Sequence, residues 1–137
     1  MPIKRHNYPP NWPQIRQRIL DRAGHRCESC GVREYTVGYR SADGELMPLI
    51  VGESYAEANT LRHRMMEVMS RRLIVVRLTT AHLDHDEWNH GVTDDRLACL
   101  CERCHFHHDQ PDNQLRKKYG TMWRRYQLPL FAATQII

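Results

Sequence analysis

The segment LACLCERCH at residues 97–105 decides the fold, because it joins an apolar run to the second of two Cys-x-x-Cys pairs. The first pair is Cys27 and Cys30, in the segment RCESCG, and the second is Cys101 and Cys104. Together they offer four thiolates, which is the ligand set of a tetrahedral structural zinc site. Since about 70 residues separate the pairs, a shared zinc ion would close a long loop and join the ends of one domain.

Two disulfides are the competing interpretation of the four cysteines. A reducing compartment disfavours them, and the first residues, Met1 to Tyr8, lack the apolar stretch of a secretory signal. We therefore expect a cytoplasmic protein with a zinc site. The fifth cysteine, Cys99, lies within the apolar run, and we expect it to be a buried core thiol.

The composition is that of a globular domain. The chain has 137 residues, of which 41% are hydrophobic and 26% charged, which argues against long disordered chains, collagens and coiled coils. No stretch approaches the roughly 20 consecutive apolar residues that cross a bilayer. We expect one domain over residues 1–126, followed by a tail over residues 127–137.

The net charge of +4 is unevenly distributed along the chain. Residues 1–26 and 110–137 are basic, whereas residues 27–109 are acidic. Basic ends around an acidic centre suit phosphate-binding flanks beside a cation site. Two solvated helices with positive faces would account for the same pattern.

Upstream of the second cysteine pair, the pattern predicts a helix, a hairpin and a second helix. The first helix is expected over residues 11–24, with Trp12, Ile15, Ile19 and Ala23 facing the core. Extended segments at 35–41 and 45–51 flank an Ala-Asp-Gly turn. The second helix runs from a Ser-x-x-Glu capping box to about Arg72, and its expected apolar face is Ala58, Leu61, Met65, Val68 and Met69.

The rest of the chain is expected to alternate strands and helices. Residues 73–83 are typical of a β-branched strand, 86–95 of a polar loop and 96–100 of a short strand. A helix should start near Glu102 and end at Pro111, and a last helix should span about 113–125.

Six of the nine histidines lie between residues 82 and 108, interleaved with aspartates. On a helix, His105 lies one turn from both His108 and Asp109. Imidazole and carboxylate ligands suit Mg²⁺, Mn²⁺ or a borderline divalent ion, so a second metal site is geometrically feasible here. Any one of these histidines alone is more often a surface or hydrogen-bonded residue.

Two motifs together resemble the HNH endonuclease family, in the four-cysteine zinc branch found in bacteria and phages. The first is AHLDHD at residues 81–86, followed by L-x-x-L-C-x-x-C-H at 97–105. The second is W-x-x-I-R-x-x-I-L-x-R-A-G-x-R-C-E-x-C-G at 12–31. The resemblance implies an α+β fold: a ββα-metal core at about 77–110, set into a treble-clef-like zinc site, with flanking helices and an inserted hairpin plus helix.

The resemblance also implies roles for individual residues. Asp84 matches the first ligand of a catalytic divalent metal, His85 the general base, and His105 the last metal ligand. His108 or Asp109 could complete the coordination shell. The reaction implied is metal-dependent hydrolysis of DNA phosphodiester bonds, with the four-cysteine zinc purely structural, in a bacterial or phage-encoded protein.

One position departs from the family pattern. The family's middle Asn corresponds to Arg96, which could contact phosphate instead. The alternative to a nuclease is therefore a catalytically inactive zinc module of the same fold that binds nucleic acid or a protein partner.

Two further interactions are expected outside the catalytic set. Arg96 with Arg116, Lys117 and Lys118 should contact phosphates, which position a protein without specifying sequence. The tail reads Gln127-Leu128-Pro129-Leu130-Phe131, which resembles the peptide that docks replication and repair proteins onto the bacterial sliding clamp. A tail that packs on the protein's own core is the alternative.

Overall fold

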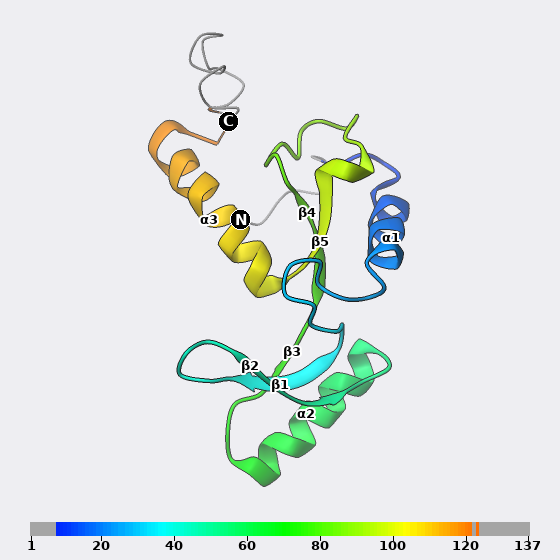
Figure 1. The fold of residues 1–137 in the computed structure, drawn as a ribbon, viewed down its shortest axis with the longest axis vertical. Coiled ribbons are helices and arrows are strands. Elements are labelled where there is room, and N and C mark those ends of the chain that lie inside the picture. Colours follow the sequence, from blue (N-terminus) through cyan, green and yellow to red (C-terminus); the bar gives the residue numbers. More distant parts are fainter. Residues whose placement is uncertain (1–7, 122, 124–137) are drawn as a thin grey trace.

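The computed structural model describes residues 8–121 and residue 123, and within them it is an α+β fold with two small antiparallel sheets (Figure 1). The elements follow in the order α1 (Trp12–Arg22), β1 (Thr36–Arg40), β2 (Leu46–Val51), α2 (Tyr55–Met69), β3 (Ile74–Val75), β4 (Leu78–His82), a 3-10 turn (Asp94–Arg96), β5 (Leu97–Cys101) and α3 (Glu102–Tyr119).

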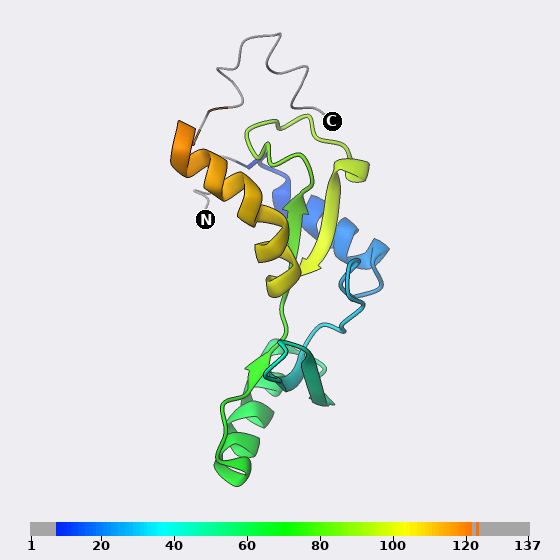
Figure 2. The same ribbon diagram turned by 60° about the vertical axis from the view of Figure 1, so that its left-hand side comes forward.

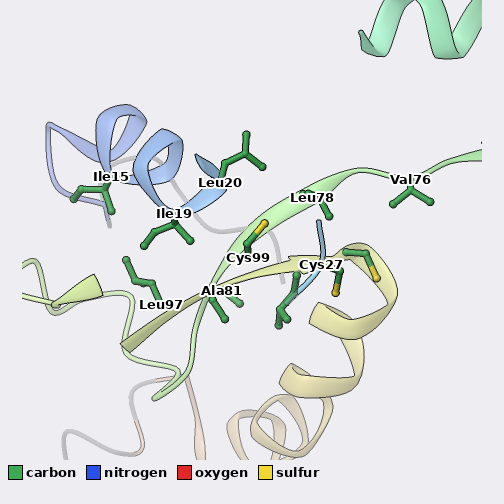
Figure 3. Packing of buried hydrophobic residues seen from close by; sticks show 12 residues of the cluster. Ile15, Ile19, Leu20, Cys27, Val76, Leu78, Ala81, Leu97 and Cys99 are labelled. Atoms are coloured by element: carbon green, nitrogen blue, oxygen red, sulfur yellow. The ribbon is translucent and has the colours of Figure 1, made fainter. Parts of the chain in front are cut away.

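The main core surrounds the antiparallel hairpin of β4 and β5. Helix α1 packs on one side of this hairpin and α3 on the other (Figure 1). Ile15 and Ile19 project from α1 onto Ala81, Leu97 and neighbouring residues of the hairpin (Figure 3). The apolar face expected for the first helix is confirmed for these two isoleucines, while Trp12 and Ala23 lie partly buried at its ends.

An insert at residues 35–76 forms a second, smaller layer. Its sheet has the order β2–β1–β3, and α2 lies against it (Figure 2). Only Val37, Ala58 and Leu73 are buried in its core, against twelve residues in the main core. The hairpin and the helix expected between the cysteine pairs are therefore confirmed, but they form a thin unit.

The insert leaves and rejoins the main core at one point. The backbone N–H of Tyr35 donates to the carbonyl of Val76 at 2.9 Å, and the N–H of Val76 donates to the carbonyl of Thr36 at 2.8 Å. The strand expected at 73–83 is consequently divided at this point. Its first part, β3, pairs with β1, and its second part, β4, pairs with β5.

The apolar face predicted for the helix at 54–72 is wrong at its C-terminal end. The side chain of Val68 is 86% exposed and Met69 is also exposed, whereas Ala58 is buried. The reason is the length of the sheet: β3 has only two residues, so the last turns of α2 extend past the surface that could cover them.

The helix expected to end at Pro111 instead continues as α3 to Tyr119. A proline inside a helix removes one hydrogen bond and costs about 3 kcal/mol. Here the turn that follows the proline is held by Arg116, which forms buried ion pairs with Asp112 and with Glu87 of the preceding loop. These contacts offset the break, so the separate helix expected at 113–125 does not exist within the described residues.

Candidate metal centres

The four cysteines of the two pairs meet at one point. The Sγ atoms all lie within 4.8 Å of one another in the group Cys27, Cys30, Cys101 and Cys104. None of the chain's five cysteines is in a disulfide. The fifth, Cys99, is 1% exposed and belongs to the main core, which confirms the prediction of a buried thiol.

The cysteine cluster fits a zinc ion. Four sulfurs at about 2.3 Å from a tetrahedral zinc are about 3.8 Å apart, and Cys30 Sγ lies 3.8 Å from Cys101 Sγ. Each pair also closes in the same way, because Cys30 N–H points to Cys27 Sγ at 3.4 Å and Cys104 N–H to Cys101 Sγ at 3.5 Å. The four cysteines could therefore hold a metal ion such as zinc.

The polarity around Cys27 favours its thiolate, which is the form that binds metal. Burial alone would raise the pKa of Cys27, but backbone N–H groups of Cys30, Cys101 and Ser29 outweigh burial and lower the pKa to about 7. The neighbouring residue, Glu28, docks this pair on β5. Its carboxylate accepts from the N–H of Cys99 at 2.7 Å, and its own N–H donates to the Cys99 carbonyl at 2.8 Å.

A second cluster, of histidine and aspartate side chains, lines a cavity of about 320 Å³ between the end of β4 and one face of α3. Of the side chains predicted for catalysis, His85, His105 and Asp109 line this cavity. One ligand atom from each of His85, His108 and Asp109 also lies within 4.8 Å of the others. The rings of His85 and His108 stack with their centroids 4.4 Å apart.

Asp109 is the centre of this cluster. One carboxylate oxygen lies 3.3 Å from His85 Nδ1, and the other lies 2.9 Å from His105 Nε2. Burial raises the pKa of Asp109, but hydrogen bonds from His105 and His85 outweigh it and hold the pKa well below its usual range. The carboxylate is therefore charged, with an imidazole on each side.

Thr79 on β4 fixes the proton on His105. Its hydroxyl donates to the Leu100 carbonyl at 2.9 Å, so its oxygen is left to accept from His105 Nδ1 at 2.7 Å. Two adjacent ligands at about 2.1 Å from an octahedral ion lie about 3.0 Å apart, and His105 Nε2 lies 2.9 Å from the Asp109 carboxylate. The pair thus has the spacing of two ligands of one ion.

His85 occupies a strained turn directly after β4. Its φ is +57°, in the left-handed region that residues other than glycine rarely adopt. The turn is held from two sides, because His85 N–H donates to the His82 carbonyl at 3.1 Å and Arg116 Nη2 donates to the His85 carbonyl at 2.6 Å. This turn directs His85 toward α3.

Arg116, predicted to contact phosphate, lies in an internal ion network. Its guanidinium donates to both carboxylate oxygens of Glu87, at 2.7 and 2.9 Å, and to Asp112 at 2.6 Å. Donation to Glu87 raises the pKa of Arg116 further above its usual range. The side chain is only 10% exposed, so its positive charge pairs with these internal carboxylates and does not face a phosphate at the surface. Lys117 and Lys118 are exposed on the same helix.

Asp84 and Arg96 form a pair of their own. The guanidinium of Arg96 contacts one oxygen of the Asp84 carboxylate, and the other oxygen accepts from the backbone N–H of Asp86 at 3.1 Å. Within the part of the chain that the structure describes, Asp84 neither lines the cavity nor belongs to either metal-ligand group. Arg96 thus occupies the carboxylate that the resemblance assigns to the metal.

Sequence reasoning missed several residues of this site. Thr79, Glu87 and Asp112 had no visible signal, apart from the helical spacing of Asp112 and Arg116. Tyr8 and His82 also line the cavity, and they stack with Trp12, whose ring lies 5.2 Å from that of His82. The predicted clamp peptide, Gln127 to Phe131, lies outside the described residues.

Comparisons with known proteins give no relative. No family model, curated protein or solved structure matches this chain. Among the helices of the described residues, none combines the length and the apolar character needed to cross a bilayer.

Proposed function

We propose that the protein is a metal-dependent endonuclease of the HNH type that hydrolyses DNA. The observation that carries the proposal is the placement of three side chains across a hairpin and the helix that follows it. His85 comes directly after β4, and His105 and Asp109 lie on the first turns of α3, where Asp109 contacts both histidines. The order of a hairpin and a helix beside a four-cysteine cluster supports the ββα-metal core and the treble-clef-like zinc site.

His85 is proposed as the general base. A neutral imidazole that donates from Nδ1 to Asp109 keeps its Nε2 lone pair free to accept a proton from water. Asp109 then fixes the ring's orientation and stabilises the charge that the ring gains. Asp112, 3.9 Å from the same nitrogen, adds to this effect.

His105, Asp109 and Asp84 are proposed to hold the catalytic divalent ion, with His108 beside them. Thr79 orients His105 through Nδ1, which is how ligating histidines are commonly fixed. The ion, Mg²⁺ or Mn²⁺, neutralises charge on the phosphate and the leaving oxygen. For Asp84 to take part, it must exchange Arg96 for the ion. The zinc site is proposed to be structural, holding the start of α3 against the knuckle at residues 27–31.

The contact between Arg96 and Asp84 favours a second candidate function. An arginine on a ligand carboxylate supplies a positive charge that competes with a cation at the same oxygen. The alternative is accordingly an HNH-type zinc module that binds nucleic acid or a protein partner without cleaving.

Nicking of supercoiled plasmid in Mg²⁺, Mn²⁺ or EDTA tests the proposal. We expect metal-dependent nicking by the wild type, loss of at least 100-fold in His85→Ala, and full activity in His107→Ala, a control on the exposed side of α3. Unchanged nicking in His85→Ala would refute the assignment. An inactive wild type together with an active Arg96→Asn variant would instead establish the non-cleaving module.

A further inference from the structure

A second hollow, of about 770 Å³, lies away from the catalytic cavity. Three segments form its walls: residues 26–33, which include the zinc knuckle, the β1–β2 hairpin, and Cys101 with the first turn of α3. The turn of the hairpin reaches α3, because a Cβ on Gly44 would lie 2.6 Å from the Arg103 guanidinium. The insert and the zinc knuckle thus share one groove.

The charge of this groove is strongly positive. It is lined by four arginines, Arg26, Arg33, Arg40 and Arg103, and by a single carboxylate, Glu45. None of the four arginines forms an ion pair with any of the described carboxylates. Elsewhere the structure does neutralise arginines, since Arg18 pairs with Asp94 and Arg22 with Glu28.

The neighbouring cysteines do not cancel this charge. A zinc ion with four thiolates carries a formal charge of about −2, which is less than the net three positive charges of the lining. Arg33 and Arg40 also lie outside the two Cys-x-x-Cys motifs at residues 27–30 and 101–104. The groove therefore retains a positive charge with the zinc site filled.

The lining suits a phosphate backbone better than stacked bases. Guanidinium groups match phosphate oxygens with paired hydrogen bonds. Among the residues that the structure describes, no aromatic side chain lines the groove, so these residues offer no platform on which bases could stack. Backbone contacts of this kind are independent of base sequence.

The groove and the catalytic cavity use different faces of α3. Arg103 and Cys104 face the groove, whereas His105 and Asp109 line the cavity. A nucleic acid at the cavity would therefore reach the groove only with a more distant part of its backbone. This separation makes the groove an anchoring site, distinct from the site of cleavage.

We propose that this arginine-lined groove, shared by the insert and the zinc knuckle, binds the phosphate backbone of DNA away from the scissile bond. The proposal rests on the proposed function for its choice of DNA as the nucleic acid. The insert would then contribute to DNA binding, although it contains none of the proposed catalytic residues.

The test measures binding of the full-length, zinc-loaded protein to a fluorescein-labelled DNA duplex by anisotropy. Ca²⁺ replaces Mg²⁺, so that binding is separated from cleavage. The double variant Arg33→Gln/Arg40→Gln should bind about tenfold more weakly, and the slope of log affinity against log salt should fall by about 2. Arg64→Gln/Arg72→Gln is the matched control, with the same change of charge at exposed positions outside the groove.

Zinc content and plasmid nicking complete the measurement. Weaker binding by the groove variant alone, with one zinc retained, supports the proposal whether or not plasmid is nicked. Equal binding by wild type and groove variant overturns it even if nicking is normal, and so does equal loss in both variants. If polyglutamate displaces the DNA and binds as tightly as the duplex does, the groove would instead be assigned to an acidic protein partner.

Discussion

Arg116 donates a 2.6 Å hydrogen bond to the backbone carbonyl of His85, across 31 residues of sequence. The same guanidinium neutralises Glu87 and Asp112, whose side chains are 5% and 3% exposed. One side chain therefore supports the turn that carries the proposed base, and it also compensates two buried charges.

Replacing Arg116 with Met should destabilise the fold by about 3 kcal/mol. The variant removes the guanidinium that pairs with two buried carboxylates, which costs more than the net worth of the ion pairs. Urea unfolding followed by circular dichroism measures the change. Lys117→Met, at the adjacent exposed position, should alter stability by less than about 0.5 kcal/mol. A stable Arg116→Met protein would mean that the network is unimportant for folding.

Cys101→Ser should abolish the folded state, while Cys99→Ser should remain folded with its zinc. Both residues lie on β5 and both are buried, but only Cys101 belongs to the four-sulfur cluster. Structural zinc supplies folding free energy, so loss of one ligand removes it. Zinc stoichiometry and amide spectra of the two variants are the measurement, and a folded, zinc-free Cys101→Ser protein would contradict a structural role.

While the main core stays folded, Cys99 should be the slowest of the five thiols to react. Burial raises the pKa of Cys99 to about 11, so its thiolate is about 0.1% of the total at pH 8, and the thiolate is the reactive form. Alkylation under conditions that keep the main core folded, followed by mass spectrometry, should find Cys99 modified last. Labelling of Cys99 as fast as that of the four clustered cysteines would contradict its protection by the folded core.

Thr79→Val should weaken binding of the catalytic ion by about 10- to 100-fold. The valine keeps the shape of the side chain but removes the oxygen that accepts from His105. Thr80→Val is the matched control, because consecutive residues of a strand point to opposite faces. Calorimetric titration with Mn²⁺ compares the two. Equal affinities in both variants would separate Thr79 from the metal site.

Gly38→Ala should open the insert, at a cost of at least about 2 kcal/mol to the insert's stability. Gly38 lies at the irregularity between β1 and β2, where a Cβ would stand 2.3 Å from the backbone oxygen of Met47. Backbone on a paired strand has little room to move. Limited proteolysis reports opening of β2, and Gly91→Ala, where the nearest atom is a side-chain oxygen at 3.4 Å, is the neutral control.

The four-cysteine cluster can be predicted directly from the sequence, because Cys-x-x-Cys spacing is a local constraint. The first helix and the hairpin at 36–51 are also visible, since periodicity and turn residues are local. The path of α3 through Pro111 is not. It depends on Asp112 and Arg116 meeting a glutamate 29 residues away, and such tertiary contacts override a local helix breaker.

The same limit applies to the His-Asp cluster. Helical spacing brings His105 and Asp109 together, so the sequence could indicate that pair. It could not indicate that Asp109 also contacts His85, since this depends on how α3 packs against β4. Nor could it reveal that Arg96 contacts Asp84, because Arg96 follows 12 positions later, after a loop whose course has no periodic signal.

The paired backbone bonds of Tyr35, Thr36 and Val76 have a consequence for how this chain can change. They hold both ends of the insert side by side, so the insert joins the main core through a short neck at residues 35–36 and 76. Everything between those ends can lengthen, shorten or be exchanged without moving Cys30 relative to Cys101. The insert can therefore be replaced, in evolution or by protein engineering, while the neck keeps its position. A foreign domain with adjacent termini, spliced into the exposed turn at 42–43, should leave the zinc clasp and the cavity beside α3 intact.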